Sequence, residues 1–395
     1  MASKRLLIAG TLGTFVLMLA STLPYPLLDA FVVDRFDTGP LATSLFVSVN
    51  LAAYVLLAPL WGALVDATGR ARLLVGIALL GQGVTLAVEP SIPTYPLLLA
   101  DRFLEGAFTI LAMTALHATV LARTERGRAG AAIGAVGLGM ALGVAGGSAL
   151  GGVLGQRALS LPFHVGGALL IAAAGTVPLL LPAGLAQRRR VPLARSLALL
   201  KRVPALAWPV GLSFLDRLTV GFLVGILPLY LADARGLPPA SIGALMSAFL
   251  LCFGLAQPVA GKLSDRWGRL GFVILGSAAY GAMLLAIPLT ELPWLWGVMA
   301  AGGVVGALMF APTFALVRDL APADEQGAGV GLFHQAGSLG FAAGPLLGAA
   351  VVEAGGTTLA FLAMGVLEAV AACTLALLAW RRIGLAGQPV GAPVR

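Results

Sequence analysis

The chain contains 395 residues, of which 59% are hydrophobic and only 11% are charged. Soluble domains carry about a quarter charged residues, so this composition excludes an ordinary soluble protein and indicates an integral membrane protein. The formal net charge of +8 does not indicate nucleic-acid binding, which requires basic residues gathered on one face of a soluble module. Cys252 and Cys373 have no spacing typical of a disulfide framework or a zinc site.

Apolar runs long enough to cross a bilayer, about 20 residues each, recur along the whole chain. The first run follows Lys4 and Arg5 and is too long for the apolar region of a signal peptide. We predict helices over residues 6–28, 41–63, 73–90, 95–120, 129–154, 162–182, 207–231, 241–260, 271–290, 293–317, 328–352 and 358–380. The sequence therefore predicts an all-α membrane protein with twelve transmembrane helices.

The basic residues fall mainly in alternate breaks between these runs. Because Lys and Arg gather in cytoplasmic loops, the pattern places the N-terminus inside. Only Arg35, Arg157 and Arg235 then face outward, while Arg102 and Arg217 lie within helices. We expect a multi-pass protein of the cell (plasma or inner) membrane with both termini cytoplasmic.

A repeated pattern, Gly-x-x-x-Asp-x-x-Gly-Arg, follows the second and the eighth predicted helices. Its residues are Gly62, Asp66, Gly69 and Arg70 in the first copy and Gly261, Asp265, Gly268 and Arg269 in the second. The two copies indicate that the chain consists of two similar halves.

The longest polar break divides these halves and is rich in arginine. We predict a six-helix bundle over residues 1–182, a basic cytoplasmic linker over 183–206, and a second six-helix bundle over 207–395 that ends in a short cytoplasmic tail. The two bundles are expected to be pseudo-symmetric. Halves in the same orientation form a parallel repeat, the arrangement of a class of transporters whose substrate site lies near the bilayer midplane.

Three ionisable residues, Asp101, Arg102 and Glu105, interrupt the fourth apolar run. A charge at bilayer depth costs at least a few kcal/mol, so it needs a partner or a function. Helical spacing allows all three side chains to meet on one flank. Because two acids share one arginine, we expect one carboxyl group to bind a proton. Glu105 is the first candidate for this proton carrier, and Asp101 is the alternative candidate. The alternative is that the charges only neutralise one another and hold helices together.

Other buried or terminal charges are less easily interpreted. Asp216 and Arg217 form a second pair in the seventh helix, where adjacent side chains diverge by about 100°, so each is expected to contact another helix. We expect this pair to take part in proton coupling together with Asp101, Arg102 and Glu105 of the fourth helix. Glu89 lies at the outer end of the third helix and is expected at the membrane rim. Glu368 lies in the middle of the twelfth helix with no predicted partner.

The double Gly-x-x-x-Asp-x-x-Gly-Arg pattern, the twelve helices and the basic linker together resemble the major facilitator superfamily over essentially the whole chain. Arg102 and Gly106 resemble the Arg-x-x-x-Gly motif of that family's fourth helix, which is linked to proton coupling. The resemblance implies two bundles that rock to open alternately to each side of the membrane.

A glycine motif of the fifth helix narrows the resemblance to the family's 12-helix drug:proton antiporters. It contains Gly143, Gly147 and Gly151, although Ser148 replaces the usual proline. The eleventh helix carries the proline form of the motif, with Gly344, Pro345 and Gly348. Glycine at four-residue spacing also lets a neighbouring helix approach closely, so we expect both sets to serve helix packing.

The resemblance assigns further expected roles. The residues of the two Gly-x-x-x-Asp-x-x-Gly-Arg copies would form a conformational latch, with Asp66 near the start of the eleventh helix; alternatively, these charges only fix topology. In the family the first, fourth, seventh and tenth helices line the substrate cavity. The candidate cavity residues, which include polar side chains on other helices, are Tyr25, Asn50, His117, Phe222, Gln257, Phe310, Phe314, His334 and Gln335.

We therefore expect a secondary active transporter that exports lipophilic, drug-like solutes in exchange for protons. The alternatives are transport of a sugar, amino acid, peptide or lysolipid, by coupled transport or by uniport, or a transport-dead sensor on the same fold. The catalytic motifs of membrane enzymes do not occur in the sequence. A phosphate-binding loop at Gly261-Lys262 would require Ser or Thr at the next position, where the chain has Leu263. We therefore do not expect an enzyme. We expect a monomer that uses the proton gradient without a cofactor, metal or nucleic-acid partner.

Overall fold

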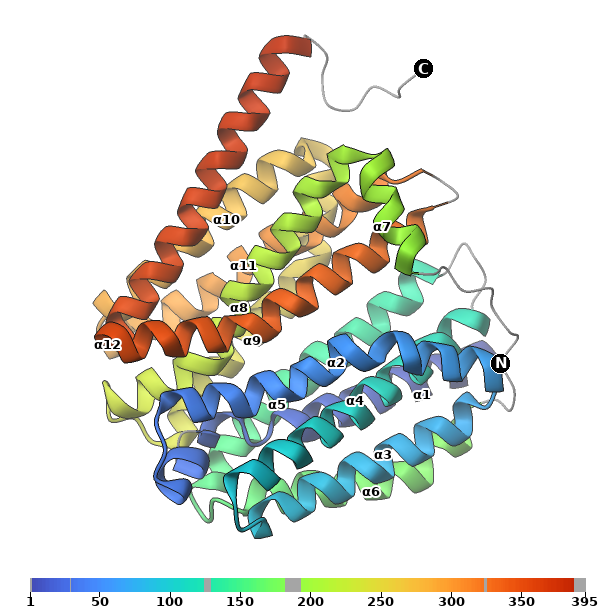
Figure 1. The fold of residues 1–395 in the computed structure, drawn as a ribbon, viewed down its shortest axis with the longest axis vertical. Helices are drawn as coiled ribbons and strands as arrows, with labels where there is room; N and C mark the ends of the chain where they lie inside the picture. The colour runs from blue at the N-terminus through green and yellow to red at the C-terminus, as the bar shows by residue number, and fades with distance from the viewer. Residues whose placement is uncertain (1, 29, 124–128, 182–192, 323–324, 387–395) are drawn as a thin grey trace. The chain divides into compact units, whose positions relative to one another are not determined.

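The computed structural model describes residues 2–28, 30–123, 129–181, 193–322 and 325–386, and every regular element within these ranges is helical (Figure 1). The long helices are α1 Ala2–Thr22, α2 Pro40–Thr68, α3 Ala71–Val88, α4 Tyr95–Arg123, α5 Ala129–Gly155, α6 Leu161–Leu180, α7 Leu193–Arg202, α8 Ala207–Asp233, α9 Pro239–Trp267, α10 Arg269–Ala286, α11 Leu292–Leu320 and α12 Gln326–Ala386. The single-turn elements are η1 Tyr25–Leu27, η2 Ala30–Asp34, η3 Glu89–Ser91, η5 Pro204–Leu206 and η6 Ile287–Leu289.

The element α12 consists of two helices. Its backbone leaves the helical region at Gly355 (φ −165°, ψ 17°) and Gly356 (φ 85°, ψ 170°). Within the described residues, 11 segments are long and apolar enough to cross a membrane, and the last of them, Ala328–Leu377, contains this break. Counted as two helices, it completes the predicted set, so the all-α fold with twelve transmembrane helices is confirmed.

The sequence predicts that each Gly-x-x-x-Asp-x-x-Gly-Arg copy follows the end of a helix. In the structure, most of each copy instead lies within the last turns of that helix. Gly62 and Asp66 lie in the last turns of α2, which ends only at Gly69 (φ 61°), whose N–H donates to the Val65 carbonyl at 3.0 Å. In the second copy α9 likewise continues to Trp267, and Gly268 has φ 95°. Only the second glycine of each copy adopts the left-handed conformation that glycine favours.

The chain divides into two compact units, residues 1–190 with 224–250 and residues 191–223 with 251–395. In the first unit α1 packs on α5 and α6, α2 on α4, and α3 on α4 and α6 (Figure 1). In the second unit α10 packs on α11 and α12. The boundaries of the predicted linker, 183–206, stay a prediction; α7 and η5 lie within it.

The glycine stripe of α5 lies directly against the backbone of α1. A Cβ atom added to any of its three motif glycines would collide with a backbone carbonyl oxygen of α1 or of Leu23, the residue that follows α1. The pairs are Gly143 with Phe15, Gly147 with Leu19, and Gly151 with Leu23. The Thr22 hydroxyl also donates across this interface to the Val144 carbonyl, 3.2 Å away. These glycines therefore permit close packing of the two helices.

The second unit repeats this interface between α8 and the first part of α12. A Cβ atom at Gly340 would collide with the Phe214 carbonyl, and one at Gly344 with the Leu218 carbonyl. Pro345 and Gly348 are buried in the same helix. The same spacing of glycines thus serves equivalent helix pairs in both units.

This packing predicts that Gly147→Ala will destabilise the protein by about 1–3 kcal/mol through overpacking. Gly146→Ala is the matched control, because its Cβ would meet only the Leu19 Cδ1 atom at 3.7 Å. Both changes raise helix propensity equally, so the difference between them isolates the α1 contact. Equal unfolding free energies for the two variants in detergent would contradict the interpretation.

Candidate functional site

Arg102, on α4, lies at the centre of a buried charged cluster in the first unit. Its side chain is 2% exposed, Glu105 is 1% exposed and Glu89 is 0% exposed. One guanidinium nitrogen, Nη1, contacts the Glu89 carboxylate at 3.2 Å and also pairs with the Glu105 carboxylate one helical turn away. The guanidinium lies 4.2 Å from the ring centroid of Phe46 on α2, a cation–π contact. A single cation therefore serves two buried carboxylates.

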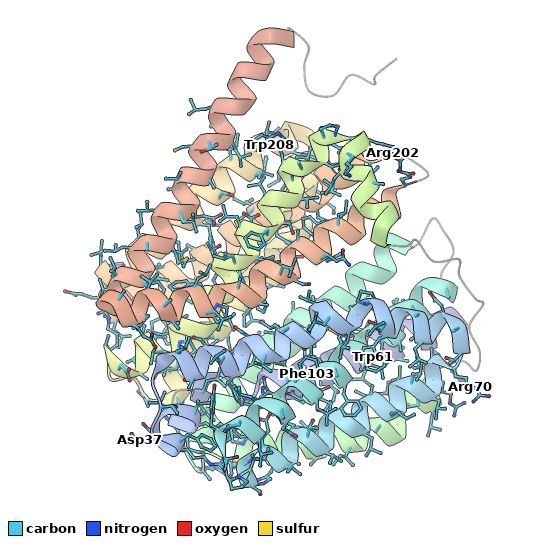
Figure 2. All side chains as sticks on the ribbon, viewed as in Figure 1. Asp37, Trp61, Arg70, Phe103, Arg202 and Trp208 are labelled. Carbon is cyan, nitrogen blue, oxygen red and sulfur yellow. The ribbon has the colours of Figure 1, made fainter. Side chains whose placement is uncertain are left out.

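Close packing of α2 on α4 brings amide side chains to this cluster. A Cβ atom at Gly106 would collide with the Asn50 carbonyl oxygen, so glycine permits the approach of α2. Asn50 Nδ2 donates to Glu105 Oε2 at 3.0 Å and to the Arg102 carbonyl at 3.1 Å. Further along the same interface, the Trp61 indole donates to the Ala107 carbonyl at 2.9 Å (Trp61 and Phe103 mark the two helices in Figure 2).

Gln82, on α3, connects the cluster to α1. Its Nε2 lies 3.4 Å from Glu105 Oε1 and 2.6 Å from the Ser21 hydroxyl. Its Oε1 is buried and has no hydrogen-bond partner among the described residues. Tyr25, in η1, lies near enough to interact with the charges of Arg102 and Glu105. The site thus draws side chains from the first four long helices of the chain and the turns between them.

The second acid that pairs with Arg102 is one that the sequence did not indicate, while the proposed proton-coupling role of Asp101 stays a prediction. Arg102 and Glu105 pair as expected, but Asp101 makes no ion pair with Arg102, and its Oδ2 has no hydrogen-bond partner within the described ranges. Glu89 takes that position, although it was expected at the rim. It begins the turn η3 after α3, and the packing of α3 on α4 directs it inward.

In the second unit, Asp216 and Arg217 of α8 contact different helices, as their spacing predicts. The Arg217 guanidinium lies 4.2 Å from the ring centroid of Phe310 on α11. The Asp216 carboxyl group is close enough to Glu368, on the second part of α12, to interact with it. Glu368, for which the sequence offered no partner, is therefore a neighbour of Asp216.

Three candidate cavity residues, Phe310, Phe314 and His334, come together around Phe333. Ring centroids are 5.7 Å apart for Phe310 and Phe333, 5.4 Å for Phe314 and Phe333, and 5.8 Å for Phe314 and His334. Phe333 was not singled out in the sequence, since an isolated aromatic residue in an apolar run carries no signal. The four rings form an aromatic cluster on α11 and α12.

The other cavity candidates are dispersed. Phe222 is fully buried and packs on Phe361, with centroids 5.0 Å apart. His117, Gln257 and Gln335 are partly buried on α4, α9 and α12. Their proposed contact with substrate stays a prediction.

The two copies of the latch motif differ. In the second unit Arg269 pairs with Asp265 at 2.8 Å and also with Asp319 at the end of α11. In the first unit Asp66 and Arg70 form no ion pair within the described part of the chain. Asp319 was missed because it lies outside the repeated pattern. The predicted contact of Asp66 with the start of the eleventh helix involves residues of both units, and it stays a prediction.

Comparisons with a family profile and with individual proteins agree on one protein family. The profile of the Major Facilitator Superfamily matches residues 10–215 and 209–393. An uncharacterised MFS-type transporter of Methanocaldococcus jannaschii is 30% identical over 162 residues, a match that spans 40% of this chain and 42% of that protein. Multidrug resistance protein MdtG of Serratia proteamaculans is 26% identical over 88% of this chain and 87% of its own length.

The fold matches solved transporters. A bacterial homologue of the human lysosomal transporter Spinster, solved in an inward-facing and unoccupied conformation, aligns with a TM-score of 0.83 and 14% identity. The alignment covers 99% of each chain. At this identity the likeness supports the fold alone.

Proposed function

The chain belongs to the Major Facilitator Superfamily and is a multi-pass membrane transporter, and we propose that it exports lipophilic solutes in exchange for protons. The family is one of transporters rather than enzymes. We place the protein in the cell membrane with both termini cytoplasmic, because its basic residues gather in alternate breaks between helices.

The proposal depends above all on the charge balance around Arg102. Two carboxylates, Glu89 and Glu105, contact one guanidinium where all three side chains are almost completely buried. An uncompensated charge in an apolar interior is strongly unfavourable. Binding of one proton balances the cluster. Buried ionisable groups inside membrane proteins are by default functional, and here the chemistry they provide is reversible protonation.

Glu105 is the proposed proton carrier because neighbouring side chains can hydrogen-bond with both its carboxylate form and its protonated form. As a carboxylate it accepts hydrogen bonds from Asn50 and Arg102. As a carboxylic acid it gains an O–H donor, and Gln82 Oε1, which has no partner among the described residues, can accept that bond after rotation of its amide. Protonation also weakens the pairing with Arg102. The two states therefore favour different side-chain arrangements, which is the requirement for a bias between conformations.

The nature of the solute is inferred from two features. The aromatic cluster of Phe310, Phe314, Phe333 and His334 provides flat faces suited to a lipophilic guest. The Serratia relative that aligns over most of the chain is named a multidrug resistance protein. Both observations support a broad class of flat, lipophilic compounds rather than a single metabolite.

Transport of ethidium, a flat lipophilic cation, by the purified full-length protein in liposomes tests the proposal. We expect an imposed pH gradient to drive dye movement, and a protonophore to abolish that movement. Protein-free liposomes give the background. Dye movement that persists after the gradient is dissipated would exclude proton coupling. A folded protein that moves a nucleoside, sugar or lysolipid but no dye would exclude the proposed solute class.

A further inference from the structure

A second pair of buried acids lies in the second unit, where α8, α10 and the second part of α12 meet. Asp216 is 2% exposed, and Glu368 is 0% exposed. The helices that carry them are in contact, since Phe222 of α8 packs on Phe361 of the second part of α12 with ring centroids 5.0 Å apart, and the two carboxyl groups are close enough to interact. Their surroundings include the buried hydroxyl groups of Thr219 and Ser277.

Close packing of α10 on the second part of α12 fixes the position of Glu368. A Cβ atom added to Gly281 would lie 2.9 Å from the Gly365 carbonyl oxygen and 3.2 Å from the Glu368 Cβ. The glutamate therefore emerges at a tight interface rather than toward lipid. Its carboxyl group has no route to the membrane surface by side-chain rotation alone, since the residue lies in the middle of its helix.

Neighbouring N–H and O–H groups do not satisfy the buried carboxyl oxygens of Asp216 and Glu368. Although the Thr219 and Ser277 hydroxyls are nearby, neither Glu368 oxygen has a donor in good hydrogen-bond geometry within the described residues, and the same holds for Asp216 Oδ1. Two ionised carboxylates have acceptors only. Facing each other in an apolar interior, they would repel and remain unsatisfied.

The available charges do not neutralise both acids. Arg217 of α8 is the neighbouring cation, and its guanidinium stacks on Phe310 of α11 without an ion pair to either carboxyl group among the described residues. Tyr280, on α10, interacts with both acids, but an uncharged phenol supplies no positive charge. A single positive charge, that of Arg217, thus lies near two acids.

We propose that Asp216 and Glu368 form a second proton-binding site, in which the two buried carboxyl groups hold one proton between them. The protonated group donates its O–H to the other, so that one proton both removes the repulsion and supplies the missing hydrogen bond. The site carries a net charge of −1, which Arg217 balances. This rests on the proposed function only in assigning that proton to the transport cycle.

Infrared spectroscopy of the purified full-length protein tests the site without any need for transport. We expect the carbonyl band of a protonated carboxyl group, shifted in D₂O, in the wild type at neutral pH. The band should lose part of its intensity in the double variant Asp216→Asn/Glu368→Gln, which keeps the protonated carboxyl group proposed beside Arg102. Glu353→Gln, an exposed glutamate on the same element α12, is the control and should keep it. Identical bands in the wild type and the folded double variant would overturn the proposal.

A second arm separates a proton from a metal ion, because two carboxylates and two hydroxyls could also hold sodium. The spectrum should be the same in sodium chloride and in choline chloride. A band that grows when sodium is removed would instead show a cation site and overturn the proton assignment. If the double variant does not fold, the single variants Glu368→Gln and Asp216→Asn are measured instead, since each should weaken or shift the band.

Proteoliposomes then test participation in transport. With the ethidium assay, we expect Glu368→Gln to alter the pH dependence of dye movement, while Glu353→Gln leaves it unchanged. A weakened infrared band with an unaltered pH dependence would limit the pair to a static structural proton and overturn its place in the cycle. Absence of dye movement in the wild type would count against the proposed function and leave the infrared result standing.

Discussion

Glu105→Gln should abolish dye-driven proton movement in proteoliposomes while leaving the protein folded. Glutamine has nearly the same shape as glutamate and can hydrogen-bond with Asn50 and Gln82, but it cannot carry a proton. Arg102 keeps its contact with Glu89 in this variant, so the buried guanidinium is not left without a carboxylate. An internal pH-sensitive dye reports the proton movement, and ethidium supplies the driving gradient.

Two further variants make this result specific. Glu291→Gln changes an exposed glutamate and should behave as the wild type. Asp101→Asn should retain most of the proton movement, because Asp101 does not pair with Arg102 within the described residues. Proton movement that is unchanged in folded Glu105→Gln would exclude Glu105 as the carrier, and its loss in Asp101→Asn alone would transfer the role to Asp101.

Arg102→Met should destabilise the first unit by about 3–5 kcal/mol, the usual effect of removing one partner of a buried ion pair. The variant leaves Glu89 and Glu105 buried without their cation, although methionine fills part of the same volume. It also removes the stacking on Phe46. Denaturant titration of the purified protein in mixed micelles measures the change in unfolding free energy.

The double variant Arg102→Met/Glu105→Gln identifies the cause of that loss. Removing one of the two orphaned carboxylates should recover part of the stability, because residues in one ion-pair network are not additive. Arg157→Met, at an exposed arginine, is the control and should have little effect. A loss at Arg102 no greater than that at Arg157, or no recovery in the double variant, would contradict the account of the cluster.

The transmembrane helices were predictable because crossing a bilayer demands about 20 apolar residues with all backbone groups bonded within the helix. That requirement is local and leaves a direct pattern in the chain. Helix ends were less predictable, since α2 and α9 continue through charged residues until a glycine with positive φ ends them. The glycine stripe of α5 was predicted correctly as a packing surface, and the structure supplies its partner, α1.

The buried charges were predictable only where both partners lie on one helix. Arg102 and Glu105 are one turn apart, so their pairing follows from helical geometry. The contacts of Glu89 with Arg102 and of Glu368 with Asp216 join residues on different helices. Such contacts depend on how helices pack, and a glutamate at a helix end or alone in an apolar run gives no sign of its partner.

Proton release from the purified protein is the most direct test of the central claim, that Glu105 exchanges a proton for solute. Ethidium is added to the full-length protein in weakly buffered detergent solution at neutral pH, and a pH indicator records protons released on binding. We expect the wild type to release protons into the medium, whereas Glu105→Gln should bind the dye without release. Dye binding to the wild type with no proton release, or equal release from both proteins, would contradict the claim.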